Sequence, residues 1–307
     1  MATGTTELHS RRDVLLYGTG ALATVLGLGA VGVELIRVGV LPGQQELHQL
    51  AGDCSVVAPH LDYSALGPSF SSTFYSQARH RSVGYTVAYP PGHDRGSALP
   101  LIVMLHGYGG NHRDALSGMS PAQAVALEPG GTALPPMAMV TVDGGGGYWN
   151  PHPGDDPMAM VIDELLPRCR KMGLGNAPQR VGTMGISMGG FGALLLAEKY
   201  PSLISAVAAI SPAVWTTYGQ AHGANAGAFA SPQSFSANDV VTHAAALRDL
   251  PVRVASGLSD PFHPGVQALA DVLPRGAEVT FSNGCHTGPY FVSQEPASLS
   301  FLGRHLA

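Results

Sequence analysis

The stretch Val181-Gly-Thr-Met-Gly-Ile-Ser187-Met-Gly-Gly190 runs from an apolar strand pattern into a Gly-x-Ser-x-Gly turn. Residues 181–184 form the short apolar run that is typical of a buried strand, and residues 191–200 follow a helical pattern. Ser187 therefore stands at a turn from strand to helix, where Gly185 and Gly189 keep bulky side chains away from a sharp bend. This arrangement is the nucleophile elbow, and it predicts that Ser187 is an exposed nucleophile.

Short apolar runs recur along the chain, and helical patterns lie between several of them. The expected strands cover residues 84–89, 101–105, 137–142, 181–184, 207–210, 252–255 and 279–281. The expected helices cover residues 158–169, 191–200, 240–248, 266–273 and 298–306. This alternation predicts an α/β fold with a doubly wound, mostly parallel sheet and helices on both faces.

An acid and a histidine follow two of the later expected strands. Asp260 comes soon after residues 252–255, and His286 comes soon after residues 279–281. A serine needs a base to take its proton and an acid to orient that base, and functional groups gather at the carboxyl ends of parallel strands. The order Ser, Asp, His therefore predicts a catalytic triad of Ser187, Asp260 and His286. Asp239 and Asp249 are weaker candidates because they lie in or beside an expected helix, and His263 lies too near Asp260 in sequence.

The loop after residues 101–105 reads Leu105-His-Gly-Tyr-Gly-Gly110 and suits an oxyanion hole. Such a hole needs backbone N–H groups aimed at the oxygen that becomes negative. We expect these donors to be the N–H groups of Met188, directly after the nucleophile, and of Tyr108. His106 is expected to fix the loop by hydrogen bonding rather than to act as the base.

Aromatic side chains follow several expected strands and are candidates for substrate contact at the same rim. They are Tyr148, Trp149, Trp215, Phe262 and Tyr290. For the first two, which follow a run of four glycines, the alternative is that they cap the core. Core packing is an equal alternative for Trp215 and Phe262.

Metal and cofactor sites have little support in the sequence. The spacing of His152, Asp155 and Asp156 matches no zinc signature, and Asp156 before Pro157 is better placed to cap a helix. No glycine-rich loop has the form that cradles a phosphate. We therefore expect a reaction that needs neither a metal nor a cofactor.

These motifs together resemble the esterase family that includes esterase D, feruloyl esterases and the antigen 85 mycolyltransferases. The likeness rests on His106-Gly107, Gly185 to Gly190, the Asp260 loop and the His286 loop, and it covers roughly residue 81 to the carboxyl terminus. The resemblance implies an α/β-hydrolase fold and acyl transfer through a seryl ester. Thr287-Gly288-Pro289 departs from the family, which often has an aromatic or charged residue soon after the histidine.

The amino terminus has the features of an export signal. Arg11-Arg12 precedes a glycine-rich apolar run over residues 14–33, which resembles a twin-arginine signal read by the Tat export machinery. The run is about long enough to span a bilayer, so a membrane tether is the alternative. We expect residues 1–40 to be signal or anchor, residues 41–68 to be a linker and irregular lead-in, and residues 69–307 to be the catalytic domain.

Composition narrows the remaining functions. A chain of 307 residues with 45% hydrophobic residues can bury one large core. A net charge of -5 and the lack of a basic cluster beyond Arg11-Arg12 argue against nucleic acid as a partner. Three cysteines, Cys54, Cys169 and Cys285, allow one disulfide and one free thiol, but their spacing does not choose the pair.

Three functions follow from these features. The first is an exported serine esterase, located in the periplasm, the cell envelope or outside the cell, that hydrolyses small-molecule, lipid or sugar esters. The second is an envelope acyltransferase that passes the acyl group to a sugar or lipid hydroxyl. The third, a binding module without catalysis, is disfavoured by the complete Ser, Asp, His set.

Overall fold

The computed structural model describes residues 54–58, 67–114, 135–175 and 181–306, together with Gly32, Leu35 and Leu47. Arg11-Arg12, almost all of the apolar run at 14–33 and most of the expected linker at 41–68 lie outside the described residues. None of the helices within the described residues combines the length and hydrophobicity that crossing a bilayer requires.

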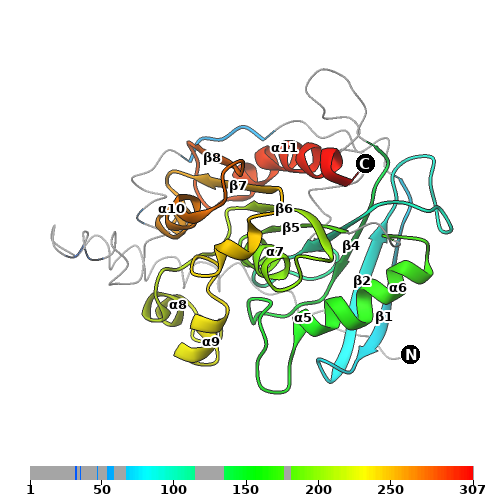
Figure 1. The fold of residues 1–307 in the computed structure, drawn as a ribbon, viewed down its shortest axis with the longest axis horizontal. Coiled ribbons are helices and arrows are strands. Elements are labelled where there is room, and N and C mark those ends of the chain that lie inside the picture. The colour runs from blue at the N-terminus through cyan, green and yellow to red at the C-terminus, as the bar shows by residue number, and fades with distance from the viewer. Residues whose placement is uncertain are drawn as a thin grey trace, which may run out of the picture.

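The described residues build an eight-stranded sheet in the order β1-β2-β4-β3-β5-β6-β7-β8 (Figure 1). β1 pairs with β2, and β2 with β4, in antiparallel fashion, whereas the other neighbours are parallel. The strands are β1 (Ser69–Ser76), β2 (Arg81–Ala88), β3 (Leu101–Leu105), β4 (Ala138–Val142), β5 (Val181–Ile186), β6 (Ile204–Ile210), β7 (Val252–Gly257) and β8 (Glu278–Ser282). The expected mostly parallel sheet is confirmed.

Helices cover both faces of this sheet, as expected (Figure 1). They are α5 (Pro157–Ala159), the π-helical η2 (Met160–Leu165), α6 (Leu166–Lys171), α7 (Met188–Lys199), α8 (Tyr218–Ala224), α9 (Pro232–Ala237), the 3₁₀ turn η3 (Ala244–Leu247), α10 (His263–Val272) and α11 (Gly288–Leu306). The side chains of α7 and α10 belong to the larger core cluster, and those of α11 to a smaller cluster on the opposite face.

Alternation along β3 shows how the two cores arise. Leu101, Val103 and Leu105 pack into the larger cluster, whereas Ile102 and Met104 pack with Leu299 and Leu302 of α11 in the smaller one. Successive side chains of a strand point to opposite faces, so a strand buried on both faces is apolar throughout. All five residues of β3 are accordingly buried.

The structure corrects several expected elements. β1 was not expected, because its sequence SFSSTFYS is rich in serine and mostly exposed at the edge of the sheet. The helix expected at 298–306 begins ten residues earlier, at Gly288, because Pro289 suits a first helical turn and Pro296 does not end the helix. The helix expected at 240–248 is reduced to the short turn η3, and the short helices α8 and α9 were not expected.

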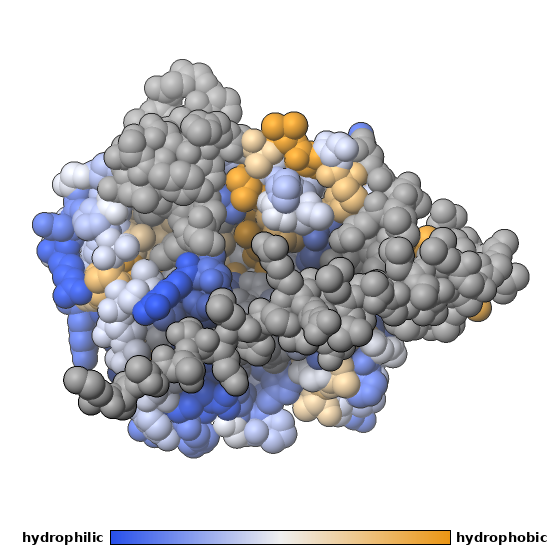
Figure 2. Space-filling view, turned by 180° about the vertical axis from the view of Figure 1, so that it is seen from behind, coloured by the Kyte–Doolittle hydropathy of each residue, from blue (hydrophilic) through white to orange (hydrophobic). Residues whose placement is uncertain are grey.

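The surface gives no sign of a large apolar docking face on the side seen in Figure 2. Hydrophilic residues cover most of the described part of that face, and the hydrophobic areas are small and separate. Scattered apolar residues of this kind are normal for a folded protein.

Candidate active site

The turn at Ser187 has the geometry that the sequence predicts for a nucleophile elbow. Ser187 links β5 to α7 with a φ of 57° and a ψ of -121°. A Cβ atom at Gly185 would lie 2.1 Å from the carbonyl oxygen of Gly189, and one at Gly189 would lie 1.9 Å from that of Leu105. Both positions therefore require glycine, and the strained serine between them is held by the surrounding close packing.

The loops that carry Asp260 and His286 are joined to each other by their backbones. The N–H of Leu258 donates to the carbonyl of Ser282, and the N–H of Ser259 donates to that of Gly284. A Cβ atom at Gly257 would lie only 2.3 Å from the carbonyl oxygen of Gly284, so glycine is needed for this approach. The ends of β7 and β8 thereby hold the acid and the histidine in a fixed relation.

Ser187, His286 and Asp260 form a continuous hydrogen-bonded chain. His286 Nδ1 lies 2.8 Å from Asp260 Oδ2, and His286 Nε2 lies 2.8 Å from Ser187 Oγ. Asp260 is fully buried, and its other oxygen accepts the N–H of Phe262. Because the buried carboxylate favours a proton on Nδ1, the free electron pair of Nε2 faces the serine hydroxyl.

The loop after β3 lies beside Ser187, as expected for an oxyanion hole. A Cβ atom at Gly107 would be 3.7 Å from Ser187 Cβ, which places this loop in contact with the elbow. Among the described residues, no hydrogen bond uses the N–H groups of Tyr108 or Met188, so both donors are available. The exposed phenol ring of Tyr108 is not needed for this role.

His106 fixes the loop that follows β3, which we call the oxyanion loop after its expected role. Its Nε2 accepts the N–H of Gly144 at 2.8 Å, and its Nδ1 donates to the carbonyl of Gly107 at 2.8 Å. Burial lowers the pKa of this imidazole, which keeps it neutral and preserves this pattern of one donor and one acceptor. Both ring nitrogens are therefore occupied, and His106 is not available as a base.

A row of aromatic rings leads away from His286 on one side. The Phe262 ring lies 5.1 Å from the imidazole, the Trp215 ring 5.3 Å from Phe262, and the Tyr148 ring 5.0 Å from Trp215. Trp215 and Phe262 are half-buried, whereas Tyr148 is 5% exposed and burial raises its pKa to about 12. We call Phe262, Trp215 and Tyr148 the aromatic row, and its two half-buried members have surface to offer a ligand.

Trp149 and Tyr290 were expected at the substrate rim, and the structure corrects this. Both side chains have an exposed fraction of 0%. The Trp149 indole fits against Gly144 and Gly192 and donates to the carbonyl of His106. These two aromatics therefore support the site from the interior.

The weaker candidates have other partners. Asp156 accepts the N–H of Ala159 and caps α5, as expected, while Asp155 forms ion pairs with Arg79 and Arg81. Asp239 caps a local turn, Asp249 pairs with Arg248 at the surface, and His263 begins α10. Within the described ranges, no three His, Cys, Asp or Glu side chains gather in a way that could hold a metal ion.

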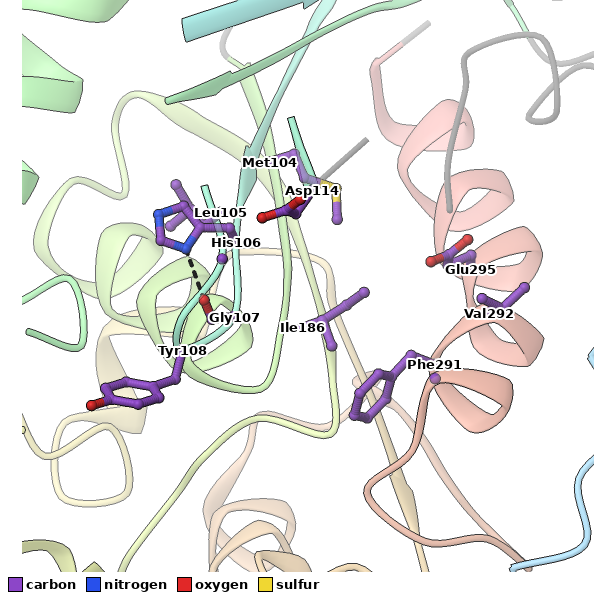
Figure 3. A pocket seen from close by; sticks show the side chains of 12 residues that line it. Met104, Leu105, His106, Gly107, Tyr108, Asp114, Ile186, Phe291, Val292 and Glu295 are labelled. Carbon is purple, nitrogen blue, oxygen red and sulfur yellow. Dashed lines mark hydrogen bonds between the residues drawn. The ribbon is translucent and has the colours of Figure 1, made fainter. Parts of the chain in front are cut away.

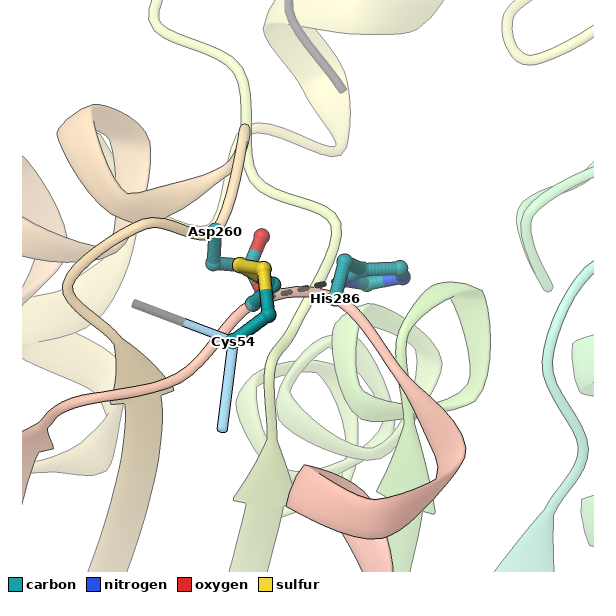
Figure 4. The surroundings of a disulfide bond; sticks show 4 residues. Cys54, Asp260 and His286 are labelled. Carbon is teal, nitrogen blue, oxygen red and sulfur yellow. Dashed lines mark hydrogen bonds and ion pairs between the residues drawn. A yellow bond between two sulfur atoms is a disulfide. The ribbon is translucent and has the colours of Figure 1, made fainter. Parts of the chain in front are cut away.

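A disulfide joins Cys54 to Cys285, the residue directly before His286 (Figure 4). The two cysteines are 231 residues apart in sequence. The third cysteine, Cys169, is free and buried. In Figure 4 the sulfur atoms lie beside the Asp260–His286 pair. The loop that carries the histidine is therefore tied covalently to the segment that precedes β1.

A pocket of about 240 Å³ lies between the loop that follows β3 and α11 (Figure 3). Its lining residues are Met104, Leu105, His106, Gly107, Tyr108, Gly110, Asp114, Ile186, Gly288, Phe291, Val292 and Glu295. The Phe291 ring lies 4.9 Å from the imidazole of His286. Phe291 and Glu295 were not among the expected site residues, although Gly288-Pro289 is a helix start that would have extended the expected helix to include them.

Comparison with solved structures identifies the fold class. The S-formylglutathione hydrolase of Agrobacterium tumefaciens is similar over 82% of this chain and 100% of its own, with 16% identity and a TM-score of 0.62. MPT51 of Mycobacterium tuberculosis matches 78% of this chain and 100% of its own, with 16% identity and a TM-score of 0.60. A ferulic acid esterase of the fungus Anaeromyces mucronatus matches 81% and 96%, with 16% identity and a TM-score of 0.57. The fold is that of the α/β-hydrolases.

The family is shown by sequence. A sequence model of the family described as "Putative esterase" matches residues 76–290, which is more than half of the chain. The chain therefore belongs to this esterase family. No curated protein sequence matches it significantly.

Proposed function

We propose that the protein hydrolyses carboxylic esters through an acyl-enzyme on Ser187. The observation that carries this proposal is the chain of two 2.8 Å contacts from Ser187 through His286 to buried Asp260. A serine hydroxyl is a weak nucleophile until a base takes its proton, and this arrangement supplies the base and the acid that orients it. Membership of the esterase family supports the same reaction.

In the first half of the reaction, Ser187 Oγ attacks the ester carbonyl carbon while its proton passes to His286 Nε2. The carbonyl oxygen becomes an oxyanion, which the N–H groups of Tyr108 and Met188 stabilise. The C–O bond to the alcohol then breaks, and His286 returns the proton to the departing oxygen. In the second half, water gives a proton to His286 Nε2 and attacks the acyl carbon. The bond from that carbon to Ser187 Oγ then breaks, and His286 returns the proton to Oγ as the acid leaves.

Labelling with a fluorophosphonate probe tests the nucleophile. We expect the probe to label wild-type protein on Ser187 alone and to leave Ser187→Ala unlabelled, with hydrolysis of p-nitrophenyl acetate lost in the same variant. Ser259→Ala, which removes another hydroxyl from the loop of Asp260, serves as the matched control and should be labelled normally. Labelling of Ser187→Ala at the wild-type level would refute the assignment.

A second candidate function is transfer of the acyl group to a sugar or lipid hydroxyl. It uses the same acyl-enzyme, and the pocket between the β3 loop and α11 favours it because an acceptor has room there. Mass spectrometry of products formed with and without trehalose or glycerol distinguishes the two reactions. Free acid as the main product in both cases supports hydrolysis, whereas an acylated acceptor supports transfer.

We further propose that the protein is exported in folded form by the twin-arginine route. The proposal rests on Arg11-Arg12 before the apolar run, and the Cys54–Cys285 disulfide supports it because such bonds persist mainly in oxidising compartments. Replacing both arginines with lysine is expected to retain the protein in the cytoplasm, with Cys54 and Cys285 open to alkylation. Unchanged export of the lysine variant would contradict this route.

A further inference from the structure

The pocket beside α11 adjoins the reacting groups, and the Tyr108 ring, 6.3 Å from that of Tyr148, lies between it and the aromatic row. Ile186 directly precedes Ser187, Gly107 touches the elbow, and Phe291 contacts the ring of His286. A volume of about 240 Å³ has room for roughly eight water molecules at about 30 Å³ each. A substrate whose carbonyl carbon lies at Ser187 can therefore place one of its two ends in this pocket.

Glu295 brings a carboxyl group into this otherwise largely apolar wall. It belongs to α11, is 4% exposed, and its Oε2 has no hydrogen-bond partner within the described residues. Figure 3 shows its carboxyl group pointing from α11 toward the side of the pocket that carries Met104 and Asp114. A buried polar atom without a partner is costly, and one that faces a pocket can be satisfied by a ligand.

The neighbouring groups leave Glu295 without an internal partner. Both ring nitrogens of His106 already have partners, and the Asp114 carboxylate accepts two hydrogen bonds from Asn111. The rest of the lining includes the apolar side chains of Met104 and Ile186 and, from α11 itself, Val292. Pro296 has no N–H for the Val292 carbonyl, so a further acceptor on the same turn lacks its usual helix bond.

The electrostatic environment favours a neutral ligand. Burial raises the pKa of Glu295 to about 8, and no neighbouring charge contributes to this shift. The group is therefore mostly a neutral acid at pH 7, which both donates and accepts a hydrogen bond. A hydroxyl group has the same dual capacity and needs no charge on its partner.

We propose that Glu295 is a specificity-determining residue that hydrogen-bonds a hydroxyl group on the end of the ester that occupies this pocket. The inference rests on the proposed ester hydrolysis at Ser187 and narrows its substrates to hydroxylated esters. The hydroxyl belongs either to the alcohol part, as in an ester of a polyol or sugar, or to the acyl part, as in a hydroxy acid. The chemistry is the same in both cases, and the substrates below distinguish them.

Two pairs of esters, in which a hydroxyl replaces a methyl group of similar size, test the proposal. The first pair is 4-hydroxybutyl butanoate and pentyl butanoate, and the second is methyl 6-hydroxyhexanoate and methyl heptanoate. We expect wild-type protein to prefer the hydroxylated member of one pair by about ten-fold or more in kcat/KM, because the alkyl member leaves Glu295 unpaired. The pair that shows the preference identifies the end of the substrate that the pocket holds.

Variants then attribute the preference to one carboxyl group. Glu295→Leu is expected to abolish or reverse it, whereas Glu295→Gln, which retains a donor and an acceptor, is expected to keep most of it. Glu198→Leu is the matched control, because Glu198 is also a buried acid without a side-chain partner but does not line the pocket. If Glu295→Leu does not fold in a thermal unfolding assay, Glu295→Met takes its place.

The possible outcomes separate this inference from the proposed function. Wild-type protein that hydrolyses p-nitrophenyl acetate but shows no preference in either pair overturns the role of Glu295 alone. A preference that survives in Glu295→Leu, or faster hydrolysis of butyrylcholine than of either hydroxylated ester, overturns it too, the latter in favour of a cationic ligand. Absence of both ester hydrolysis and fluorophosphonate labelling instead refutes the proposed function.

Discussion

The aromatic row and the pocket beside α11, which both adjoin His286, differ in what they offer to a ligand. On one side the aromatic row packs ring against ring, and its one deeply buried member, Tyr148, touches the rings of Trp215, Phe191 and Phe229. On the other side Phe291 begins a pocket whose wall contains a buried carboxyl oxygen without a partner. The aromatic row offers apolar surface, whereas the pocket offers one carboxyl oxygen, on Glu295, that has no hydrogen-bond partner among the described residues. We therefore expect the aromatic row to contribute mainly to affinity and the pocket to contribute mainly to selectivity.

The largest effect on turnover is expected from changes to the group of Ser187, His286 and Asp260. It should be the same whether a substrate occupies the aromatic row or the pocket beside α11. Asp260→Asn removes the charge that orients His286 and stabilises its imidazolium form. We expect kcat to fall by roughly 10² to 10⁴ with little change in KM. The factor should be the same for aromatic esters and for hydroxylated esters, measured with saturating kinetics on both.

Asp239→Asn and Asp249→Asn are the controls for this change. Asp239 accepts hydrogen bonds only from its own turn, and Asp249 lies at the surface beside Arg248. Both variants are expected to retain nearly full turnover. Near-normal turnover of Asp260→Asn together with collapse in one of the controls would relocate the acid.

A smaller effect is expected on the aromatic side alone. Trp215→Ala removes the middle ring of the row, so its contacts to Phe262 and Tyr148 are lost. We expect kcat/KM for methyl 3-phenylpropanoate to fall by about ten-fold relative to methyl butanoate, while the Glu295-dependent hydroxyl preference stays unchanged. Tyr75→Ala, which removes an exposed ring from β1, is the control. Loss of the hydroxyl preference in Trp215→Ala would show that the two sides form one subsite.

The sequence predicted the centre of the site better than its sides, for a physical reason. Ser187, Asp260 and His286 each follow an apolar strand, and the carboxyl ends of parallel strands must meet at one edge of the sheet. Trp149 also follows a strand, but its direction depends on the space that Gly144 and Gly192 leave, which no local pattern reveals. The sequence alone therefore could not tell which of the aromatic side chains lie at the rim of the site and which lie in the interior.

The pocket beside α11 was not predicted because it depends on contacts between segments far apart in the sequence. The expected helix began only at residue 298, yet α11 runs through Pro296 against β5 and β6, where tertiary packing outweighs the lost hydrogen bond. Glu295 looks like an ordinary surface acid in sequence, but in the folded chain it is buried in the wall of a pocket that the β3 loop also lines. β1 was missed for a similar reason, because a serine-rich edge strand has little hydrophobic period.

The smallest expected effect is on stability, and it compares Glu295 with Glu198. Burial raises the pKa of Glu295 from 4.5 to about 8 and that of Glu198 from 4.5 to about 9. Each acid is protonated in the folded protein at pH values where the unfolded chain has already ionised. Folding stability from these groups is therefore fully present below about pH 4.5 and is lost as the pH rises toward 8 or 9.

Replacing either acid with leucine is therefore expected to stabilise the protein more at pH 8 than at pH 5, by on the order of 1 kcal/mol. Differential scanning fluorimetry at the two pH values measures the change, and subtracting wild type at each pH removes the contributions of the titratable groups that all variants share. If both acids are merely tolerated defects, the two leucine variants gain stability and neither changes substrate preference. If the opposed roles of the two sides hold, Glu198→Leu gains stability at no functional cost, whereas Glu295→Leu gains it together with loss of hydroxyl selectivity, as expected for a group kept unpaired for a ligand.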